Sequence, residues 1–155
     1  MPVIELVTHI HAPIEICFDL ARSIDLHKRS TAGTGEEAVA GVTSGLIGAG
    51  ETVTWRAKHF GIRQHLTSVI TAFDYPVYFR DEMVRGAFKS IKHDHRFERS
   101  GAMTIMRDLF EFESPGGLAG RLFNTLILTR YLTQLLKKRN RVIKEVGEER
   151  SVYCS

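Results

Sequence analysis

The chain has 155 residues, of which 43% are hydrophobic and 25% are charged, and its formal net charge is +3. These values indicate one soluble globular domain spanning residues 1–155, with enough chain to bury a sizeable core. No apolar run approaches the ~20 residues of a membrane span, and the two cysteines give neither a zinc motif nor a disulfide framework. The first residues lack the basic and apolar regions of a signal peptide, so we expect a cytoplasmic protein.

The first third of the chain predicts a strand, two short helices and a glycine-rich loop. Val3–His11 is rich in β-branched residues and is predicted as a strand. Pro13 suits the first turn of a helix, and a second short helix is predicted over Ile24–Arg29. Thr31–Glu51 contains six glycines, which indicate a short edge strand near Glu36–Gly41 and a mobile loop.

Two strands joined by Gly61 are predicted to form a hairpin. The strand over Glu51–Phe60 has a charged face for solvent and an inward face with Val53, Trp55, Ala57 and His59. A two-residue loop at Gly61 places His59 opposite Ile62. The same register places Trp55 opposite Leu66. The inward residues of the returning strand are then Ile62, Gln64, Leu66, Ser68 and Ile70.

A strand is predicted over Val77–Val84, after the turn Asp74-Tyr75-Pro76. Gly86 marks the next reversal, but offsets of one and of three residues fit the sequence equally well. The register of this strand is therefore open. Asp81 and Arg85 share one of its faces and lie either inside or at the surface.

A second hairpin joins Lys89–Arg99 and Ala102–Glu113 through Ser100-Gly101, a favourable two-residue turn. The opposed pairs are then Phe97–Thr104, His95–Met106, His93–Asp108 and Ile91–Phe110. On the other face Asp94 opposes Arg107, an opposite-charge pair expected toward solvent. The predicted inward residues are Ile91, His93, His95, Phe97, Thr104, Met106, Asp108, Phe110 and Phe112.

The end of the chain predicts one long amphipathic helix. Ser114 suits the N-cap and Pro115 the first turn, so the helix is predicted over Leu118–Val146. Its apolar stripe is wide enough for a helix pressed into a curved sheet. That stripe includes Leu122, Leu126 and Thr129.

The cations near the chain end are predicted as a solvated helix end, the alternative being a patch for an anionic lipid or nucleic acid. They are Lys137, Lys138, Arg139, Arg141 and Lys144.

One strand, two short helices, about six antiparallel strands and a long helix resemble the helix-grip fold of the START/birch-pollen-allergen superfamily. Its bacterial members are often labelled polyketide cyclase/dehydrase or SRPBCC proteins. The resemblance extends to the runs Gly50–Gly61, His93-x-His95-x-Phe97, Thr104-x-Met106-x-Asp108 and Pro115–Gly120. It implies an α+β fold in which a curved antiparallel sheet of about six to seven strands wraps around the C-terminal helix. Members transfer lipids, sense hormones, cyclise aromatic rings or only bind ligands, so the resemblance implies a container and not one activity.

Several polar residues fall on the predicted inward faces: His59, Gln64, His93, His95 and Asp108. A buried polar group without a partner costs about 1–3 kcal/mol, so these groups are expected to be paired, hydrated or exposed to a cavity. His93 opposite Asp108 suits a general base whose tautomer is fixed by the acid, or a pair that only sets shape and register.

His93 and His95 share a strand face and would ligate a metal together with Asp108 or His59. No third ligand is determined by the sequence, so we expect no metal and no other cofactor.

We therefore expect a protein that binds a small apolar ligand, lipid-like or polyketide-like, between the sheet and the C-terminal helix. The expected walls are Trp55, Leu66, Ile91, Phe97, Met106, Phe110, Leu122, Leu126 and Thr129. His93, His95 and Asp108 would orient the polar end of the ligand, and His59 and Gln64 are further candidate contacts. One alternative is a cyclase or dehydratase with His93 and Asp108 as its acid/base pair, and another is an interaction module whose basic helix binds a partner or an acidic membrane. Neither nucleic acid nor stable membrane insertion is expected, and no oligomeric state is predicted.

Overall fold

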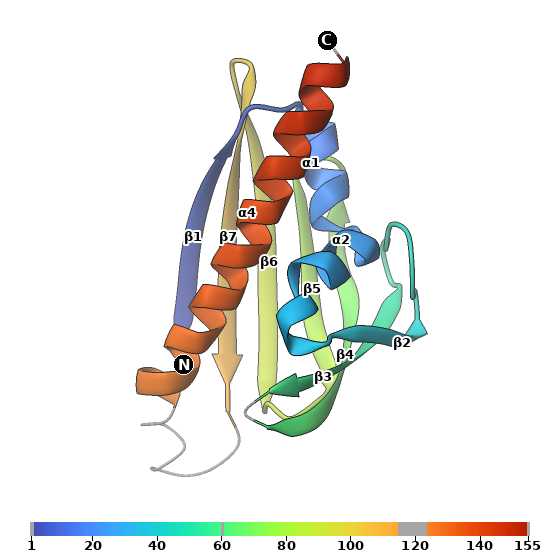
Figure 1. Cartoon of the computed structure of the whole chain (residues 1–155), viewed down its shortest axis with the longest axis vertical. Coiled ribbons are helices and arrows are strands. Elements are labelled where there is room, and N and C mark those ends of the chain that lie inside the picture. The colour runs from blue at the N-terminus through green and yellow to red at the C-terminus, as the bar shows by residue number, and fades with distance from the viewer. Residues whose placement is uncertain (1, 60, 115–123, 155) are drawn as a thin grey trace.

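One seven-stranded antiparallel sheet and one long helix form the body of the molecule (Figure 1). The computed structural model describes residues 2–59, 61–114 and 124–154. The strands are β1 (Val3–Ile10), β2 (Glu37–Gly41), β3 (Thr52–His59), β4 (Ile62–Asp74), β5 (Tyr78–Arg85), β6 (Ser90–Ser100) and β7 (Met103–Glu113). The helices are α1 (Ile14–Ala21), α2 (Ile24–Ser30) and α4 (Thr129–Cys154), with a 3₁₀ turn at Ala32–Thr34 and a π-helical turn at Asn124–Leu128. The strand order is β1-β7-β6-β5-β4-β3-β2, so the first strand pairs with the last.

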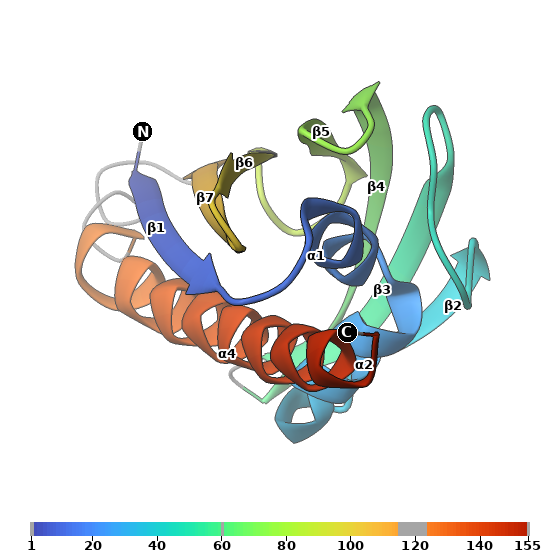
Figure 2. The same cartoon turned by 90° about the horizontal axis from the view of Figure 1, so that it is seen from above.

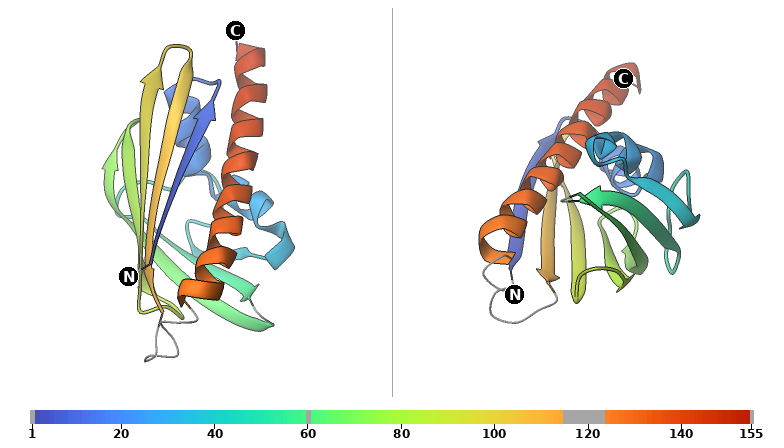
Figure 3. Two further views of the ribbon diagram at one scale, coloured as in Figure 1. Left: turned by 90° about the vertical axis from the view of Figure 1, so that its left-hand side faces the viewer. Right: turned by 60° about the horizontal axis from the view of Figure 1, so that its bottom comes forward.

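The sheet curls around α4, which crosses its concave side (Figures 1 and 2). α4 contacts β1, one edge of the sheet, and also α1 and α2, of which α2 contacts the opposite edge strand β2. Figure 3 shows the same arrangement from two further directions, with the sheet bending from β1 round to β2. The predicted curved sheet around one C-terminal helix, with two short helices after the first strand, is confirmed.

The main hydrophobic core is built around Phe18 of α1. The Phe18 ring lies edge-on to Phe73 and Phe79, with centroids 5.4 and 5.2 Å away, and its centroid is 5.3 Å from that of Phe97. α1 therefore covers one end of the sheet with closely packed aromatic rings. A second, smaller cluster consists of Ile4, Ile91, Phe112, Leu128 and Leu136. Leu66 packs against both clusters.

The predicted register of the β3–β4 hairpin is confirmed. His59 pairs with Ile62, and Trp55 pairs with Leu66. The inward positions Val53, Trp55 and Ala57 are buried, whereas the alternate positions of β3 are half-buried or exposed. Period-two alternation therefore gives the correct buried face of this hairpin.

The predicted register of the β6–β7 hairpin is wrong by two residues. Ser100 pairs with Met103, so the loop residues are Gly101 and Ala102. Gly101 has φ +62°, a left-handed conformation that glycine adopts without steric cost. The observed pairs are Phe97–Met106, His95–Asp108, His93–Phe110 and Ile91–Phe112. A shift of two residues leaves every side chain on its face, so the predicted inward set is still the inward set.

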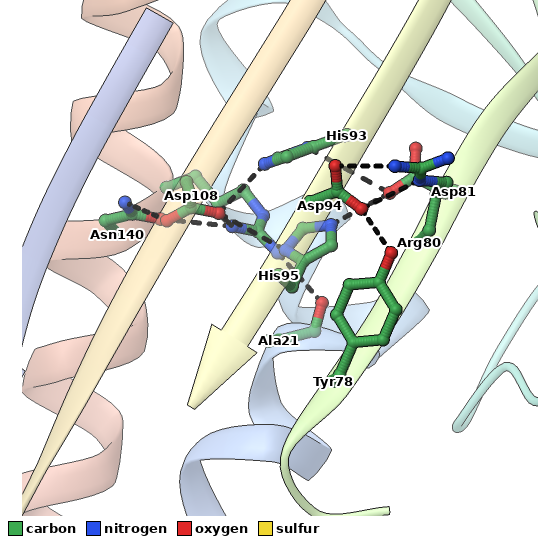
Figure 4. A network of polar contacts seen from close by, with 10 residues as sticks. Ala21, Tyr78, Arg80, Asp81, His93, Asp94, His95, Asp108 and Asn140 are labelled. Carbon is green, nitrogen blue, oxygen red and sulfur yellow. Dashed lines mark hydrogen bonds and ion pairs between the residues drawn. The ribbon is translucent and has the colours of Figure 1, made fainter. Parts of the chain in front are cut away.

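Asp94, predicted to face Arg107, lies opposite Leu109 instead. Its carboxylate is buried and accepts hydrogen bonds from Arg80 Nε and Nη2, at 2.7 and 3.0 Å, and from the Tyr78 hydroxyl (Figure 4). The predicted pair is wrong because β5, on the other side of β6, supplies the counter-charge that was expected from β7.

The register of β5, which the sequence leaves open, places Asp81 on the inner face. Asp81 pairs with Ile70 of β4 and with His93 of β6, and both of these partners are buried. Directly opposed residues share one face of a sheet, so Asp81 lies beside His93. Arg85, at the end of the strand, is exposed.

α4 continues to Cys154, past the predicted end at Val146. The predicted first turn at Pro115 and Leu118 lies outside the described residues. Among the helices of the described segments, none is both long and apolar enough to cross a membrane.

Candidate functional site

A cavity of about 230 Å³ lies between the sheet and α4. Its walls come mainly from β3, β4, β5 and β6, from the segment α1–α2 and from α4. The apolar lining residues are Ala21, Ile24, Ile47, Val53, Trp55, Ala57, Leu66, Ile70, Phe79, Ala87, Phe88, Ile91, Phe110, Leu132, Leu135 and Leu136. They include members of both hydrophobic clusters. The cavity therefore lies where the two clusters adjoin without filling the space between them.

One polar group of the cavity wall lies around Trp55. His27 Nε2 of α2 is 2.9 Å from Glu36 Oε1, and the centroid of the His27 ring is 4.2 Å from that of Trp55. His59 Nδ1 is 2.6 Å from the hydroxyl of Tyr131 on α4. The first contact orients His27 against Trp55, and the second joins β3 to α4 at the same wall.

The second polar group is a buried cluster of two histidines between two carboxylates (Figure 4). His93 and His95 are neighbours on the inner face of β6, with ring centroids 3.8 Å apart. Asp108 Oδ1 of β7 lies 2.8 Å from His93 Nε2 and 3.2 Å from His95 Nδ1. Asp81 Oδ2 of β5 lies 2.8 Å from His95 Nε2 and 3.9 Å from His93 Nδ1. Each carboxylate thus faces one nitrogen of each imidazole, and these four residues are called the His–Asp cluster below.

α4 closes the His–Asp cluster with Arg139 and Asn140, both of which are buried. Asn140 Nδ2 donates to Asp108 Oδ2 at 2.8 Å, and Arg139 Nη1 lies 3.7 Å from Asp108 Oδ1. Arg139 Nη2 also donates to the carbonyl of Ala21 at 2.9 Å. The prediction that Arg139 belongs to the solvated cations of the helix is wrong, because this side of α4 faces β7 and α1. The neighbouring Lys137 is exposed.

Burial and hydrogen bonding act in opposite directions on the His–Asp cluster. Burial acts to raise the pKa of Asp108, but the hydrogen bond from His93 and the nearby His95 ring hold that pKa well below its ordinary value. Burial acts to lower the pKa of His95, but the carboxylates of Asp108 and Asp81 beside its ring hold it above its ordinary value. Burial and the charge of His95 lower the pKa of His93. The pKa values of the two imidazoles are therefore displaced in opposite directions, that of His95 upward and that of His93 downward.

The contact that the acid/base hypothesis requires is present, because His93 Nε2 lies 2.8 Å from Asp108 Oδ1. The Asp108 carboxylate only accepts hydrogen bonds, so Nε2 of His93 carries the proton of this contact. The lone pair of a neutral His93 is then on Nδ1, on the side of Asp81. The same contact would also stabilise a buried carboxylate in a protein that catalyses no reaction. The contact therefore fits an acid/base pair and a purely structural pair equally well.

The structure is similar over nearly its whole length to solved structures of low sequence identity. TTHA0849 from Thermus thermophilus matches with a TM-score of 0.73 and 20% identity, covering 94% of this chain and 99% of that chain. Major latex-like protein 151 from Panax ginseng matches with a TM-score of 0.63 and 16% identity, covering 94% and 97%. Ara h 8.0201 matches with a TM-score of 0.63 and 13% identity, covering 92% and 97%. By sequence, no protein-family model and no curated protein matches the chain.

The chain has the helix-grip fold. The fold that the START/birch-pollen-allergen resemblance implies is thereby confirmed. Because one fold supports many activities, the function of this helix-grip protein has to be argued from its cavity and its His–Asp cluster.

Most of the predicted ligand contacts line the helix-grip cavity: Trp55, His59, Gln64, Leu66, Ile91, His93, His95 and Phe110. Asp108 lies behind the two histidines and not at the cavity wall. Within the described part of the chain, the predicted wall residues that do not line the cavity are Phe97, Met106, Leu126 and Thr129. Leu122 lies outside the described residues.

Three of these residues lie away from the cavity for two physical reasons. Phe97 and Met106 belong to the main core, because α1 inserts Phe18 over this part of the sheet. Leu126 is 63% exposed and lies in the π-helical turn before α4. A π-helical turn does not keep the 3.6-residue period, so the apolar stripe predicted from that period does not continue inward there.

Several polar wall residues are not among the predicted ligand contacts: Arg22, Ser23, His27, Thr31, Glu36, His65, Ser68, Asp81 and Arg139. Asp81 depends on the register of β5, which no turn of the sequence fixes. His27 follows the core residue Ile24 by three positions on α2, and this spacing places both on one helix face. That spacing is the signal from which the position of His27 was predictable.

Proposed function

We propose that the protein binds a small, mostly apolar molecule in the cavity between the sheet and α4. The observation that carries this proposal is the cavity itself, about 230 Å³ of space lined mainly by apolar side chains and bordered by the His–Asp cluster. Protein interiors are otherwise close-packed, and an engineered apolar cavity of about 150 Å³ already binds benzene. The proposed role is therefore that of a container for a hydrophobic compound.

The shape and chemistry of the walls support a compact ring system in preference to a long acyl chain. Ligand pockets usually measure about 300–1,000 Å³, so this cavity suits an occupant at the small end of the range. Trp55 and His27 offer aromatic rings for stacking, and they already lie against each other with centroids 4.2 Å apart. His93 and Asp81 offer hydrogen-bonding groups elsewhere on the wall. A polyketide-like aromatic compound with one hydroxyl or carbonyl group would use both.

Native mass spectrometry of freshly purified protein tests for a resident ligand. We expect a non-covalent adduct that disappears on denaturation, and its mass would restrict the ligand to a short set of compounds. A bare protein mass would count against a tightly held resident ligand.

A fluorescence titration tests whether the cavity accepts an added compound. Trp55 is the single tryptophan of the chain and lines the cavity, so its emission reports on this space. With 8-anilino-1-naphthalenesulfonate as the probe, we expect saturable quenching of Trp55. Ala57→Phe places a ring in the cavity and should lower the affinity for the probe by at least about 10-fold, equivalent to ~1.4 kcal/mol. Ala102→Phe, the same change in an exposed turn, should leave probe binding unchanged; equal binding by both variants would contradict the proposal.

A further inference from the structure

We propose that Asp81, His93 and His95 form a binding site for a divalent transition-metal ion at the wall of the cavity. Each residue offers one ligand atom, and the three atoms lie within 4.8 Å of one another. The sequence predicts no metal because it determines no third ligand beside the two histidines. The register of β5 supplies that ligand, since Asp81 pairs directly with His93.

The three ligand atoms are close to the positions that a metal needs. Asp81 Oδ2 lies 2.8 Å from His95 Nε2 and 3.9 Å from His93 Nδ1. Metal–ligand distances of about 2.0–2.2 Å in a tetrahedral site separate neighbouring ligand atoms by about 3.3–3.6 Å. These two separations lie on either side of that range, so small adjustments of the side chains would bring the ligand atoms into it. Two histidines and a carboxylate suit Zn²⁺, Co²⁺ or Fe²⁺.

Asp108 occupies the place that a supporting carboxylate has behind metal-binding histidines. A ligating histidine usually donates its second ring N–H to a carboxylate, which fixes its tautomer and orientation. Asp108 Oδ1 faces the nitrogens that would not bind the metal, His93 Nε2 at 2.8 Å and His95 Nδ1 at 3.2 Å. His95 is 2% exposed, and among the described residues its Nδ1 has no well-aligned hydrogen-bond partner despite this proximity. Coordination through His95 Nε2 would hold the ring in place and let Nδ1 donate to Asp108.

The charge of the site also favours a cation. Two carboxylates face the imidazoles, against one guanidinium, that of Arg139, whose Nη1 lies 3.7 Å from Asp108 Oδ1. Since His93 Nε2 donates to Asp108, the lone pair of His93 Nδ1 and the Asp81 carboxylate are two acceptors turned toward each other. A proton on His95 Nε2 or a metal ion between the three ligand atoms would each satisfy this arrangement.

A metal held by three protein ligands would keep at least one coordination position open toward the cavity. Asp81, His93 and His95 all line the cavity, so an oxygen of a bound molecule, or a water, would complete the coordination. The inference does not rest on the proposed ligand binding, because the site would bind the ion alone.

Metal titration of the full chain tests the inference. Protein treated with a chelator and dialysed is titrated with Co²⁺, followed by visible absorption, and with Zn²⁺, followed by calorimetry. We expect one ion per chain and the intense visible bands of four-coordinate Co²⁺. Asp81→Asn removes one ligand and should weaken the site by at least about 10-fold. The Asp81 side chain is 27% exposed, so this variant should fold, which far-UV circular dichroism verifies.

Two controls separate the site from non-specific binding. Asp74→Asn makes the same chemical change at an exposed position and should not alter the affinity. The double variant His9→Gln/His11→Gln removes two exposed histidines outside the cavity and should also bind normally. No heat and no visible bands with the natively folded protein would overturn the inference and leave the proton on His95 as the occupant. Binding that survives Asp81→Asn but is lost in the double variant would overturn it as adventitious surface binding.

Discussion

Asp108 is a carboxylate that depends on donors from two other elements. It is 3% exposed, and it accepts hydrogen bonds from His93 of β6 and Asn140 of α4. Removing a carboxylate from water is unfavourable unless donors replace the hydration. Because one donor comes from the sheet and another from α4, Asp108 both orients His93 and holds the helix against the sheet.

Asn140→Ala should destabilise the fold, because Asp108 Oδ2 loses the donor that lies 2.8 Å away. A buried acceptor left without a partner costs about 1–3 kcal/mol, and we expect a loss of this size in urea-induced unfolding. Lys137→Ala, on the exposed side of the same helix, is the matched control and should unfold like the unaltered protein. Equal stability of the two variants would show that water replaces Asn140 at no cost.

Glu36 should make stability depend on pH in the acidic range. Burial acts to raise the pKa of its carboxyl, but the hydrogen bond and charge of His27 outweigh burial and hold the pKa below the ordinary 4.5. A carboxyl whose pKa is lower in the folded state adds stability above its unfolded-state pKa, and loses it as the pH falls through the folded-state pKa. Glu36→Gln should therefore be less stable than the unaltered protein at neutral pH, and the difference should close below 4.5. Thermal unfolding of both proteins over an acid series measures it; a difference independent of pH would contradict the assignment.

At the scale of strands and helices, sequence patterns predict which face of a strand is buried better than they predict what pairs with that strand or covers it. Alternation around Gly61 predicts the β3–β4 pairing correctly, since both strands must bury the same face. The same alternation predicts that His93 and His95 lie inward. It does not predict Asp81, because β4–β5 pairing contains register shifts that no turn residue announces. It also does not show what covers a face, which is why Phe97 is predicted as a cavity wall although α1 covers it.

Gly41 and Gly101 should differ in their tolerance of a side chain, although both have positive φ, +72° and +62°. At Gly101 an added Cβ meets nothing within 4 Å. Gly101→Ala should therefore lower the free energy of unfolding only by the strain of a left-handed backbone conformation, about 1–2 kcal/mol. At Gly41 the Cβ would lie 2.2 Å from the carbonyl oxygen of Thr52, so β2 and β3 must also separate. We expect Gly41→Ala to lower the free energy of unfolding clearly more than Gly101→Ala. Equal losses in denaturant titrations would contradict the close approach of these two strands at Gly41.

At the scale of the whole molecule, α4 is fixed to the sheet along its second half. Arg139 and Asn140 bind the middle of the helix to β7 and α1, and Gly147 lies against Ile10 and Leu20. The first part of α4 contributes cavity walls such as Leu132. These contacts outside the cavity hold the helix in place. The helix residues that line the cavity therefore need not pack closely against the sheet, and the cavity persists.

Gly147→Leu should loosen this attachment. A Cβ at position 147 would lie 3.3 Å from Ile10 Cγ2 and 3.4 Å from Leu20 Cδ1, so the rest of a leucine side chain has no space. Overpacking of this kind costs about 1–3 kcal/mol, and we expect a matching fall in the midpoint of thermal unfolding. Glu149→Leu introduces the same residue at an exposed position of the same helix and should have little effect. Similar midpoints for both variants would mean that α4 shifts without loss.

The pairing of β1 with β7 constrains the order in which the chain folds. Every other pair in the sheet joins strands that are consecutive in sequence, whereas β1 pairs Val3 with Glu111. Consecutive hairpins form with short loop closures, whereas the β1–β7 pair closes a loop that spans most of the chain. During synthesis β2–β7 can therefore assemble as local hairpins while β1, although made first, has no partner strand. The N-terminal strand can therefore join the sheet only after β7 has been made, near the end of synthesis.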